Sequence, residues 1–347
     1  MNRINLEGKT ILITGAAGFI GASLAYRLLQ QEKEIRIIGV DNLNNYYDPA
    51  LKTARLEKLK DERFAFIKAD IAGPDLLDDL FEQYHPHVII HLAAQAGVRW
   101  SIDHPDDYIH SNIIGFFRIL EACRHFLPEH LVYASSSSVY GDSDVYPLKE
   151  EMNTDHPASL YAATKKSGEI LAESYAELYR IPATGLRFFT VYGPWGRPDM
   201  AYFSFADRLS HGKTIKLFNY GNCERDFTYI DDIIEGIYRV ISCPPTAGVP
   251  HRILNIGKGH PDNLMDFVTI LVEELMKAGV LPKSFDPGSH TVYLPKQMGD
   301  VGVTYADTAQ LEALTGYHPE TDLRTGLAEF CQWYAEYIWK ENNRKSI

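Results

Sequence analysis

One stretch near the start of the chain, TILITGAAGFIG at residues 10–21, runs from an apolar strand directly into three glycines. Its G-x-x-G-x-x-G spacing is one residue longer at the start than the usual turn that binds a dinucleotide between a strand and a helix. Gly15 permits the tight turn, Gly18 lets a diphosphate approach the helix N-terminus, and Gly21 lets helix and strand pack closely. A tight turn without a ligand is the alternative, but the pattern favours a cofactor-binding turn.

Outward from this turn, residues 9–134 alternate short apolar strands with longer amphipathic helices. Continuous Ile, Val and Leu runs indicate a parallel sheet that is covered on both faces. The expected strands are Thr10–Thr14, Ile35–Val40, Phe64–Lys68, Val88–His91 and Leu131–Ala134, and the expected helices lie at 18–31, 73–84 and 105–125. This order predicts an α/β fold of the doubly wound (Rossmann) type, which binds ligands at the carboxyl ends of its strands.

Acidic and small residues follow these strands at the places where a dinucleotide would lie. Asp41 ends the second strand, where a carboxylate accepts both ribose hydroxyls and repels a 2′-phosphate, so NAD is favoured over NADP. For Asp70, a surface carboxylate is an equal alternative. The residues expected to contact the cofactor are Gly15, Ala17, Gly18, Phe19, Ile20, Gly21, Asp41, Asn42, Asp70, Ile71, Leu92, Ala93, Ala94, Tyr161 and Lys165.

Tyr161 and Lys165 are four residues apart in SLYAATKKSGE (159–169), a segment that reads as helix. Both side chains therefore leave the same face of the helix. A phenol has a pKa of about 10 and is a poor base at neutral pH, but a nearby ammonium favours the phenolate. A solvated helix face explains the spacing equally well. Next to a bound hydride acceptor, however, the pair indicates a base that takes the proton of an alcohol.

The bulk properties of the 347 residues exclude several classes of function. A formal net charge of −12 argues against nucleic acid or an anionic membrane as a partner. No apolar run approaches the length of a transmembrane helix, and residues 1–9 do not resemble a signal peptide. The four cysteines are scattered and the histidines show no ligand spacing. We therefore expect reduced thiols, a cytoplasmic location and no metal site.

Four motifs in a fixed order give the chain a family resemblance: TGAAGFIG (14–21), HLAAQAGVR (91–99), YASSSSVYG (133–141) and YAATK (161–165). They resemble the extended short-chain dehydrogenases/reductases, and the match covers nearly the whole chain. Within that group the chain is most similar to the UDP-glucuronate 4-epimerases, through DNLNNYYD (41–48), RPDMA (197–201) and RDFTYIDD (225–232). The resemblance implies tightly held NAD, a UDP-sugar substrate and a C-terminal domain that closes over it.

The same resemblance implies catalytic roles for Ser136, Tyr161 and Lys165. Tyr161, as phenolate, would take the proton of the sugar 4-hydroxyl while C4 gives hydride to NAD. The hydride would then return to the other face of the 4-keto sugar, converting UDP-glucuronate to UDP-galacturonate. Lys165 would hold the nicotinamide ribose and keep the phenolate charged, and Ser136 would donate a hydrogen bond to the sugar oxygen. A serine-rich loop without a catalytic role is the alternative for the segment around Ser136.

A further set of residues is placed at the sugar nucleotide by the resemblance. Ser137 and Ser138 would line the sugar pocket, and Phe218 would lie beside uracil. Surface or interdomain ion pairs are the alternative for the arginines. The residues expected to bind the substrate are Arg99, Ser137, Ser138, Thr190, Arg197, Phe218, Arg225 and Gln297. For Asp231 and Asp232, capping of a helix N-terminus is preferred.

Four rival functions remain open at this point. UDP-glucose/galactose 4-epimerases share the catalytic group and differ only in what faces C6 of the sugar. A UDP-glucuronate decarboxylase starts with the same oxidation, although RPDMA is unlike the decarboxylases. A 4,6-dehydratase needs an Asp-Glu pair where Ser137 and Ser138 stand. A non-catalytic NAD sensor on this fold would lack the tyrosine and lysine that this chain retains.

The expected domains interleave, because the helix at 230–243 and the strand Ile253–Ile256 return to the large domain. We assign 1–187 and about 228–257 to the NAD-binding domain, and 188–227 and 258–347 to a smaller α/β domain for the nucleotide sugar.

Related enzymes commonly form homodimers through two helices that correspond to 105–125 and 159–179, packed as a four-helix bundle. In the first helix a stripe has the spacing of a buried face. Core packing within one subunit is the alternative for some of its members, which are Ile109, Ile113, Phe116, Phe117 and Leu120.

Overall fold

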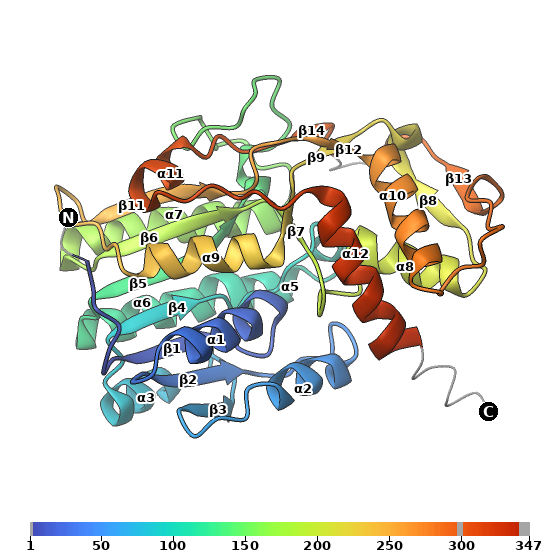
Figure 1. Cartoon of the computed structure of the whole chain (residues 1–347). Helices are drawn as coiled ribbons and strands as arrows, with labels where there is room; N and C mark the ends of the chain where they lie inside the picture. Colours follow the sequence, from blue (N-terminus) through green and yellow to red (C-terminus); the bar gives the residue numbers. More distant parts are fainter. Residues whose placement is uncertain (1–2, 297–300, 340–347) are drawn as a thin grey trace.

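The computed structural model of the chain describes residues 3–296 and 301–339, and a parallel sheet forms its centre (Figure 1). The seven strands of this sheet lie in the order β11-β6-β5-β4-β1-β2-β3, and every neighbouring pair is parallel. They are β1 (Thr10–Thr14), β2 (Arg36–Asp41), β3 (Phe64–Lys68), β4 (Val88–His91), β5 (His130–Ser136), β6 (Ala183–Phe188) and β11 (His251–Ile256). The predicted doubly wound parallel sheet is therefore confirmed.

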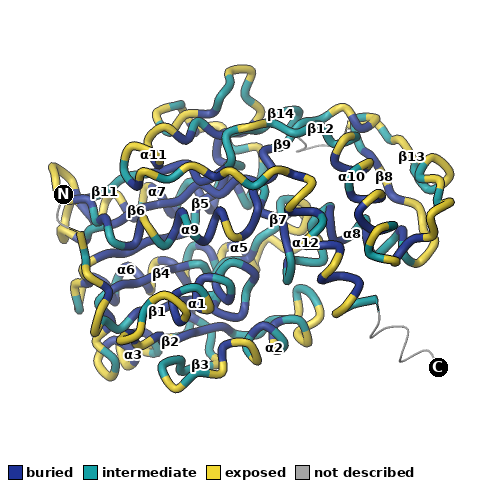
Figure 2. Tube along the Cα trace, in the orientation of Figure 1, coloured by how far each residue is buried: buried dark blue, intermediate teal, exposed yellow. Residues whose placement is uncertain are grey.

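Helices cover both faces of the sheet, in which β1, β2, β4, β5 and β6 are largely buried (Figure 2). α1 (Phe19–Gln31) packs with α9 (Ile230–Ile241) on one face, where Ile11 and Ile13 of β1 point. Leu12 points to the other face, toward the helices α3 (Leu76–Tyr84), α6 (Gly115–Phe126) and α7 (Leu160–Tyr179). The strand order reverses between β1 and β4, which opens a crevice for ligands at the carboxyl edge of the sheet.

Smaller sheets and helices extend from one end of the large sheet (Figure 1). Their strands are β7 (Thr190–Tyr192) with β10 (Phe227–Tyr229), β8 (Ile215–Leu217) with β13 (Thr291–Tyr293), and β9 (Glu224–Arg225) between β12 (Asp262–Asn263) and β14 (Val303–Thr304). Their helices are α8 (Ala201–Ser210), α10 (Leu264–Lys277) and α12 (Leu323–Tyr334), with the short segments η3 (Phe218–Gly221), η4 (Gly288–His290) and η5 (Ala335–Trp339). The helix α11 (Ala309–Thr315) packs instead on α9 and β11 of the large sheet (Figure 1). After β10 the chain returns to the large sheet through α9 and β11.

Between β2 and β3, the helix α2 (Pro49–Glu57) is absent from the sequence-based expectation. Asp48 caps it by accepting a hydrogen bond from the Ala50 N–H at 2.9 Å, and proline occupies its first turn. Its buried side chains are the charged Lys52 and Arg55, so the helix lacks the apolar periodicity that signals a core-facing helix.

The expected helix at 105–125 is divided into α5 (Pro105–Tyr108), a π-helical turn η1 (Ile109–Ile114) and α6, and is preceded by the short α4 (Trp100–Asp103). For Phe116 and Leu120 the alternative of core packing within one subunit holds, because both are buried in the cluster between α3, α6 and α7. Ile109 and Phe117 are exposed. The inserted turn rotates these faces relative to a regular helix. Among the described residues, no helix has both the length and the apolar character needed to cross a bilayer.

Candidate active site

The turn between β1 and α1 is shaped by steric requirements. Gly15 has a φ of +71°, and a Cβ there would lie 2.7 Å from the Ala93 nitrogen. A Cβ on Gly21 would lie 2.2 Å from the Gly15 carbonyl oxygen, so the helix could not approach the turn. Gly18 is the N-cap of α1, and no side chain caps the helix there. The turn therefore leaves the first amides of α1 available to an anion, while the side chain of Phe19 is buried in the core.

Asp41, at the end of β2, fixes the main chain of the turn by hydrogen bonds. Its Oδ2 accepts a hydrogen bond from the Ala17 N–H at 3.2 Å, and its Oδ1 accepts one from the Leu43 N–H at 2.8 Å. Lys52 Nζ lies 3.7 Å from the same Oδ1, and burial lowers the pKa of this lysine. The carboxylate is thus oriented by the protein and faces a buried cation.

The next predicted cofactor residues lie beside this carboxylate. Asn42 donates from Nδ2 to Asp70 Oδ2 at 3.3 Å, and Asp70 Oδ1 accepts a hydrogen bond from the Ala72 N–H at 2.9 Å. The Asp70 side chain is 42% exposed, whereas Ile71 is buried against α6. A contact of Asp70 with the cofactor therefore stays a prediction, with a surface carboxylate as its alternative.

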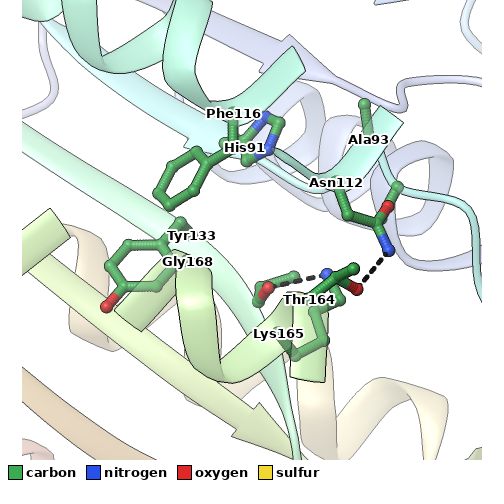
Figure 3. Close-up of a pocket in the computed structure, with 10 residues that line it drawn as sticks. His91, Ala93, Asn112, Phe116, Tyr133, Thr164, Lys165 and Gly168 are labelled. Atoms are coloured by element: carbon green, nitrogen blue, oxygen red, sulfur yellow. Dashed lines mark hydrogen bonds between the residues drawn. The ribbon is translucent and has the colours of Figure 1, made fainter. Parts of the chain in front are cut away.

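Beyond β4, residues 92–95 cross the carboxyl edge of the sheet and are tied down on both sides. The Ala93 N–H donates to Thr14 Oγ1 at 3.3 Å, and the Gln95 N–H donates to Asn112 Oδ1 at 2.8 Å. Asn112 Nδ2 in turn donates to Thr164 Oγ1 at 3.0 Å, which joins the segment to α7 (Figure 3). Burial, together with the charge of Lys165, lowers the pKa of the neighbouring His91 to about 3, so this histidine is neutral.

Ser136, Tyr161 and Lys165 meet where β5 ends and α7 begins. Ser159 caps α7 by accepting a hydrogen bond from the Ala162 N–H at 3.1 Å, which places Tyr161 in the first turn of the helix. Lys165 Nζ donates to the Ala134 carbonyl at 2.8 Å (Figure 3). Burial lowers the pKa of Lys165 to about 8, with Glu169 acting in the opposite direction.

The direction of the Tyr161 shift is opposite to the expected one. Burial raises the pKa of this phenol, although a hydrogen bond with Ser136 and the charge of Arg197 act to lower it. In this structure the Lys165 ammonium donates to the Ala134 carbonyl at 2.8 Å. That Lys165 brings the phenol into working range beside a bound hydride acceptor stays a prediction.

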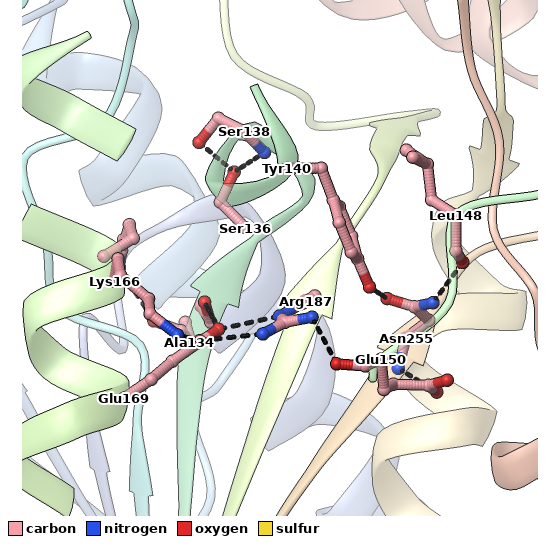
Figure 4. A network of polar contacts seen from close by, with 12 residues as sticks. Ala134, Ser136, Ser138, Tyr140, Leu148, Glu150, Lys166, Glu169, Arg187 and Asn255 are labelled. Atoms are coloured by element: carbon pink, nitrogen blue, oxygen red, sulfur yellow. Dashed lines mark hydrogen bonds and ion pairs between the residues drawn. The ribbon is translucent and has the colours of Figure 1, made fainter. Parts of the chain in front are cut away.

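Behind Ser136 lies a buried ion pair (Figure 4). Arg187 forms two parallel bonds to Glu169, with Nε–Oε1 at 2.8 Å and Nη2–Oε2 at 2.9 Å, and Ser135 donates to the same carboxylate at 2.6 Å. Breaking such a pair strands a buried charge, so the network fixes β5 against α7. Ser136 is held separately, because its Oγ accepts hydrogen bonds from the N–H and hydroxyl of Ser138.

On the sugar side, Arg197 lies close enough to Tyr161 for each to shift the pKa of the other. Arg197 Nε donates to Asp199 Oδ1 at 3.0 Å, and the Tyr46 hydroxyl donates to Asp199 Oδ2 at 3.1 Å. The Tyr108 ring meets the Tyr161 ring edge-on at 6.0 Å. The structure thus brings the predicted Arg197 together with Tyr46, Tyr108 and Asp199, which were not singled out as site residues.

The other predicted substrate residues are distributed between the two sides of the crevice. Ser137 and Ser138 form the 3₁₀ turn η2 (Ser137–Tyr140) after β5, and Thr190 begins β7. The Arg99 guanidinium lies 4.6 Å from the centre of the Phe218 ring, so the structure joins these two residues.

Arg225 is engaged by the main chain. It donates to the carbonyls of Val301 and Gly302 at 2.6 and 2.9 Å, which anchors β14. A contact with phosphate therefore stays a prediction, and Gln297 lies outside the described residues. Asp231 and Asp232 lie in the first turn of α9, as expected of acids that complement the helix dipole, although no side chain caps the helix by a hydrogen bond. Asp232 also accepts hydrogen bonds from the Tyr317 hydroxyl and the Thr321 N–H.

Two pairs of residues at the site are not predicted from the sequence, for different reasons. Tyr46 and Asp199 stand inside the quoted motifs DNLNNYYD and RPDMA, so their position in these motifs was an available signal. Arg55 and Asn112 lie in segments without a turn or glycine signal, and their roles depend on contacts with residues far along the chain. No local pattern indicates such contacts.

Comparison with known proteins places this site in a family context. The model of the NAD dependent epimerase/dehydratase family matches residues 11–257. The chain is 45% identical to Protein CapI of Staphylococcus aureus, over 95% of this chain and 99% of that protein. It is 43% identical to UDP-glucuronate 4-epimerase 3 of Arabidopsis thaliana, over 95% of this chain and 77% of that protein. The crystal structure of a UDP-glucuronic acid 4-epimerase from Bacillus cereus, in complex with UDP-glucuronic acid and NAD, is similar with a TM-score of 0.82 and 33% identity, covering 94% of this chain and 100% of that one.

Proposed function

The chain belongs to the NAD dependent epimerase/dehydratase family, and from this premise we propose that it converts UDP-glucuronate to UDP-galacturonate by inverting C4. The observation that carries the choice of sugar is the guanidinium of Arg197, which Asp199 holds at 3.0 Å and which is close enough to the Tyr161 phenol for its charge to favour the phenolate. A cation at this place suits a sugar whose C6 is a carboxylate, because C6 lies near the C4 hydroxyl that the tyrosine must reach. Relatives that carry this activity in their names support the same choice.

The residues at the carboxyl edge of the sheet fit NAD. The open N-terminus of α1 suits a diphosphate, and a side chain on Gly15 would clash with Ala93. Asp41 suits a ribose diol, and Ala93 and Ala94, which follow Leu92, line the same small cavity as Lys165. When bound here, NAD supplies the acceptor that takes hydride from C4 and returns it, and its oxidised ring carries positive charge. We assign these contacts to 1–187 and about 228–257, and the sugar nucleotide to 188–227 and 258–347.

Tyr161 handles the proton of the reaction. Its phenolate takes the proton of the 4-hydroxyl and gives it back after the ring has presented its other face, a role worth about 10²–10⁴ in rate. Ser136 donates a hydrogen bond to the sugar oxygen. Because burial raises the pKa of Tyr161, the phenolate depends on every nearby donor and cation, including Ser136 and Arg197.

The C6 carboxylate must be restrained, since a 4-keto uronic acid loses CO₂ when its carboxylate stands perpendicular to the ketone. Arg197, Thr190, Ser137 and Ser138 provide a cation and three hydroxyls for this purpose. At the other end of the substrate, Arg99 and Phe218 form one unit that offers a cation to the diphosphate and a ring to uracil. Arg225 and Gln297 complete the proposed substrate contacts.

A homodimer through α6 and α7 is part of the proposal. Phe117 on α6, Ile109 and Ile114 on η1, and Ile170 and Leu178 on α7 are all exposed, although they are large and apolar. Neighbouring helices with such faces indicate a protein–protein contact. We also expect a cytoplasmic location, because each of the four cysteines is free.

The direct test is to incubate the purified protein separately with UDP-glucuronate, UDP-glucose and UDP-xylose, without added NAD. We expect UDP-glucuronate alone to give its C4 epimer, with deuterium at C4 retained in the product. Conversion of UDP-glucose instead would identify a hexose epimerase, and release of CO₂ would identify a decarboxylase. Exchange of the deuterium with water would contradict the hydride mechanism.

A further inference from the structure

Arg55, in the last turn of α2, is an arginine buried against main-chain carbonyls. Its side chain is 2% exposed, and its guanidinium makes five hydrogen bonds to neutral oxygens. Nε and Nη2 both donate to the Trp195 carbonyl, at 2.9 and 2.6 Å, and Nη2 donates to the Gly196 carbonyl at 3.0 Å. Nη1 donates to the Ala17 carbonyl at 3.1 Å and to the Tyr47 hydroxyl at 2.7 Å. Across the described ranges, no carboxylate forms an ion pair with it.

These acceptors belong to two segments that serve different ligands. Ala17 lies inside the glycine turn of the cofactor side. Trp195 and Gly196 directly precede Arg197, which lies beside Tyr161. One guanidinium therefore spans the two sides of the crevice. A rigid planar fork with five donors is suited to such a junction, whereas a lysine ammonium offers a single point of attachment.

The segment that Arg55 holds is conformationally strained. Trp195 has a φ of +64°, a left-handed conformation that is unfavourable for a residue with a side chain. Such strain persists only where the surroundings enforce it. Here the two bonds from Arg55 hold the Trp195 carbonyl, and the indole ring packs 5.3 Å from Trp333 and 4.3 Å from Tyr337, measured between ring centres.

The other end of the segment 195–199 is also contacted by a residue close to α2. Asp199 accepts the hydroxyl of Tyr46, which lies next to Tyr47, a partner of Arg55. The part of the chain that contains α2 thus contacts the segment 195–199 both before and after Arg197.

We infer that Arg55 is a positioning residue, which sets the segment 195–199 against the glycine turn so that Arg197 is aimed at the C6 carboxylate. This inference rests on the proposed function for the identity of the carboxylate. It assigns no chemical step to Arg55, which touches neither the substrate nor the reacting atoms. Its loss should weaken recognition of the uronate while leaving recognition of UDP intact.

The test uses the holoenzyme and three variants, Arg55→Met, Arg55→Lys and the control Arg63→Met. Arg63 also donates to main-chain carbonyls, those of Leu29 and Glu32, but it lies beyond the other end of α1. For each protein we would measure the Kd of UDP-glucuronate and of UDP, the retained NAD, and hydrogen–deuterium exchange in peptides covering 193–199.

Arg55→Met should weaken UDP-glucuronate about tenfold to 10²-fold, the range expected for a misplaced binding group, with UDP changed less than twofold and faster exchange at 193–199. Arg55→Lys should recover part of the affinity, and Arg63→Met should change neither quantity. If Arg55→Met fails to fold, Arg55→Lys carries the same comparison with a smaller shift.

Equal losses for UDP and UDP-glucuronate, or unchanged exchange at 193–199, would overturn the positioning role. Wild-type protein that binds UDP-glucuronate no more tightly than UDP would instead contradict the proposed substrate. The exchange measurement still decides on Arg55 in that case, because it does not depend on the sugar.

Discussion

The cofactor side and the sugar side of this site are built in different ways. On the cofactor side, Gly15 and Gly21 are fixed by steric exclusion against backbone atoms of the turn and of the segment after β4, and Asp41 holds the turn by a hydrogen bond from the Ala17 N–H. On the sugar side, Arg197 takes its position from Tyr46 and Arg55, which stand about 150 residues earlier. Steric exclusion leaves a single arrangement, whereas charged side chains can change partners. The cofactor side should therefore resist change and the sugar side should adapt to its ligand.

Tyr161 stands where the two sides meet, and its substitution should have the largest effect. Tyr161→Phe removes the group that exchanges the proton, so turnover should fall by about 10²–10⁴ with NAD still bound. Product formation from UDP-glucuronate, followed by NMR, measures the loss. Tyr26→Phe, on the exposed face of α1, is the control and should retain full turnover. Near-normal turnover in Tyr161→Phe would remove the tyrosine from the mechanism.

Arg197→Gln tests whether the sugar side recognises the C6 carboxylate of the substrate. A hydrogen bond to a charged group contributes about 1.5–3 kcal/mol, so the Kd of UDP-glucuronate should rise about 10-fold to 10²-fold. UDP lacks the carboxylate and should bind as before, and both constants can be measured by calorimetry. An equal loss for both ligands would show that Arg197 supports the diphosphate instead, and the choice of a uronic acid would lose its main support.

Gly15→Ala tests the steric account of the cofactor side. The new Cβ would require a left-handed alanine and would meet the backbone of Leu92 and Ala93, so we expect a loss of about 1–3 kcal/mol in the free energy of unfolding, together with loss of NAD. Gly212→Ala is a matched control, because Gly212 has a similar φ of +66° and nothing lies within 4 Å of its added Cβ. Urea titration of both variants separates the clash from the backbone strain. Equal losses in the two variants would mean that contact with Ala93 does not matter.

The same contrast explains what the sequence predicts and what it does not. The sheet, the glycine turn and the meeting of Ser136 with Tyr161 follow from patterns that are local or set by strand order, because the carboxyl ends of parallel strands share one edge. α2 is missed because its buried residues are Lys52 and Arg55, and their partners lie on distant segments.

Electrostatic effects are the hardest to predict from the sequence. The i, i+4 spacing places Tyr161 and Lys165 on one face, but it cannot show that the lysine is bound to the Ala134 carbonyl. For the same reason, the paired state of Arg197 with Asp199 is visible only in three dimensions. Residue type and spacing indicate which groups lie close together. The tertiary packing determines the electrostatic environment of each group.

The dependence of activity on pH gives the smallest expected effect. Burial lowers the pKa of Lys165 to about 8, so its ammonium is lost as the pH rises through that value. If the charge assists Tyr161 when the substrate is bound, activity should fall about twofold at pH 8 and about tenfold by pH 9. Tyr161 alone predicts the opposite trend, because a raised pKa makes its phenolate more abundant at high pH.

The variant Lys165→Arg distinguishes these two contributions, since a guanidinium stays charged throughout the range. Its activity should be lower at neutral pH but should not fall between pH 8 and 9. In the wild type, the free energy of unfolding should change with pH in the opposite direction to the activity. The unfolded chain keeps the lysine proton to a higher pH than the folded chain, so the free energy of unfolding gains from this residue as the pH rises from about 8 toward the ordinary lysine value. An alkaline fall that persists in Lys165→Arg would assign the titration to another group and would leave the lysine on the cofactor side as a structural contact only.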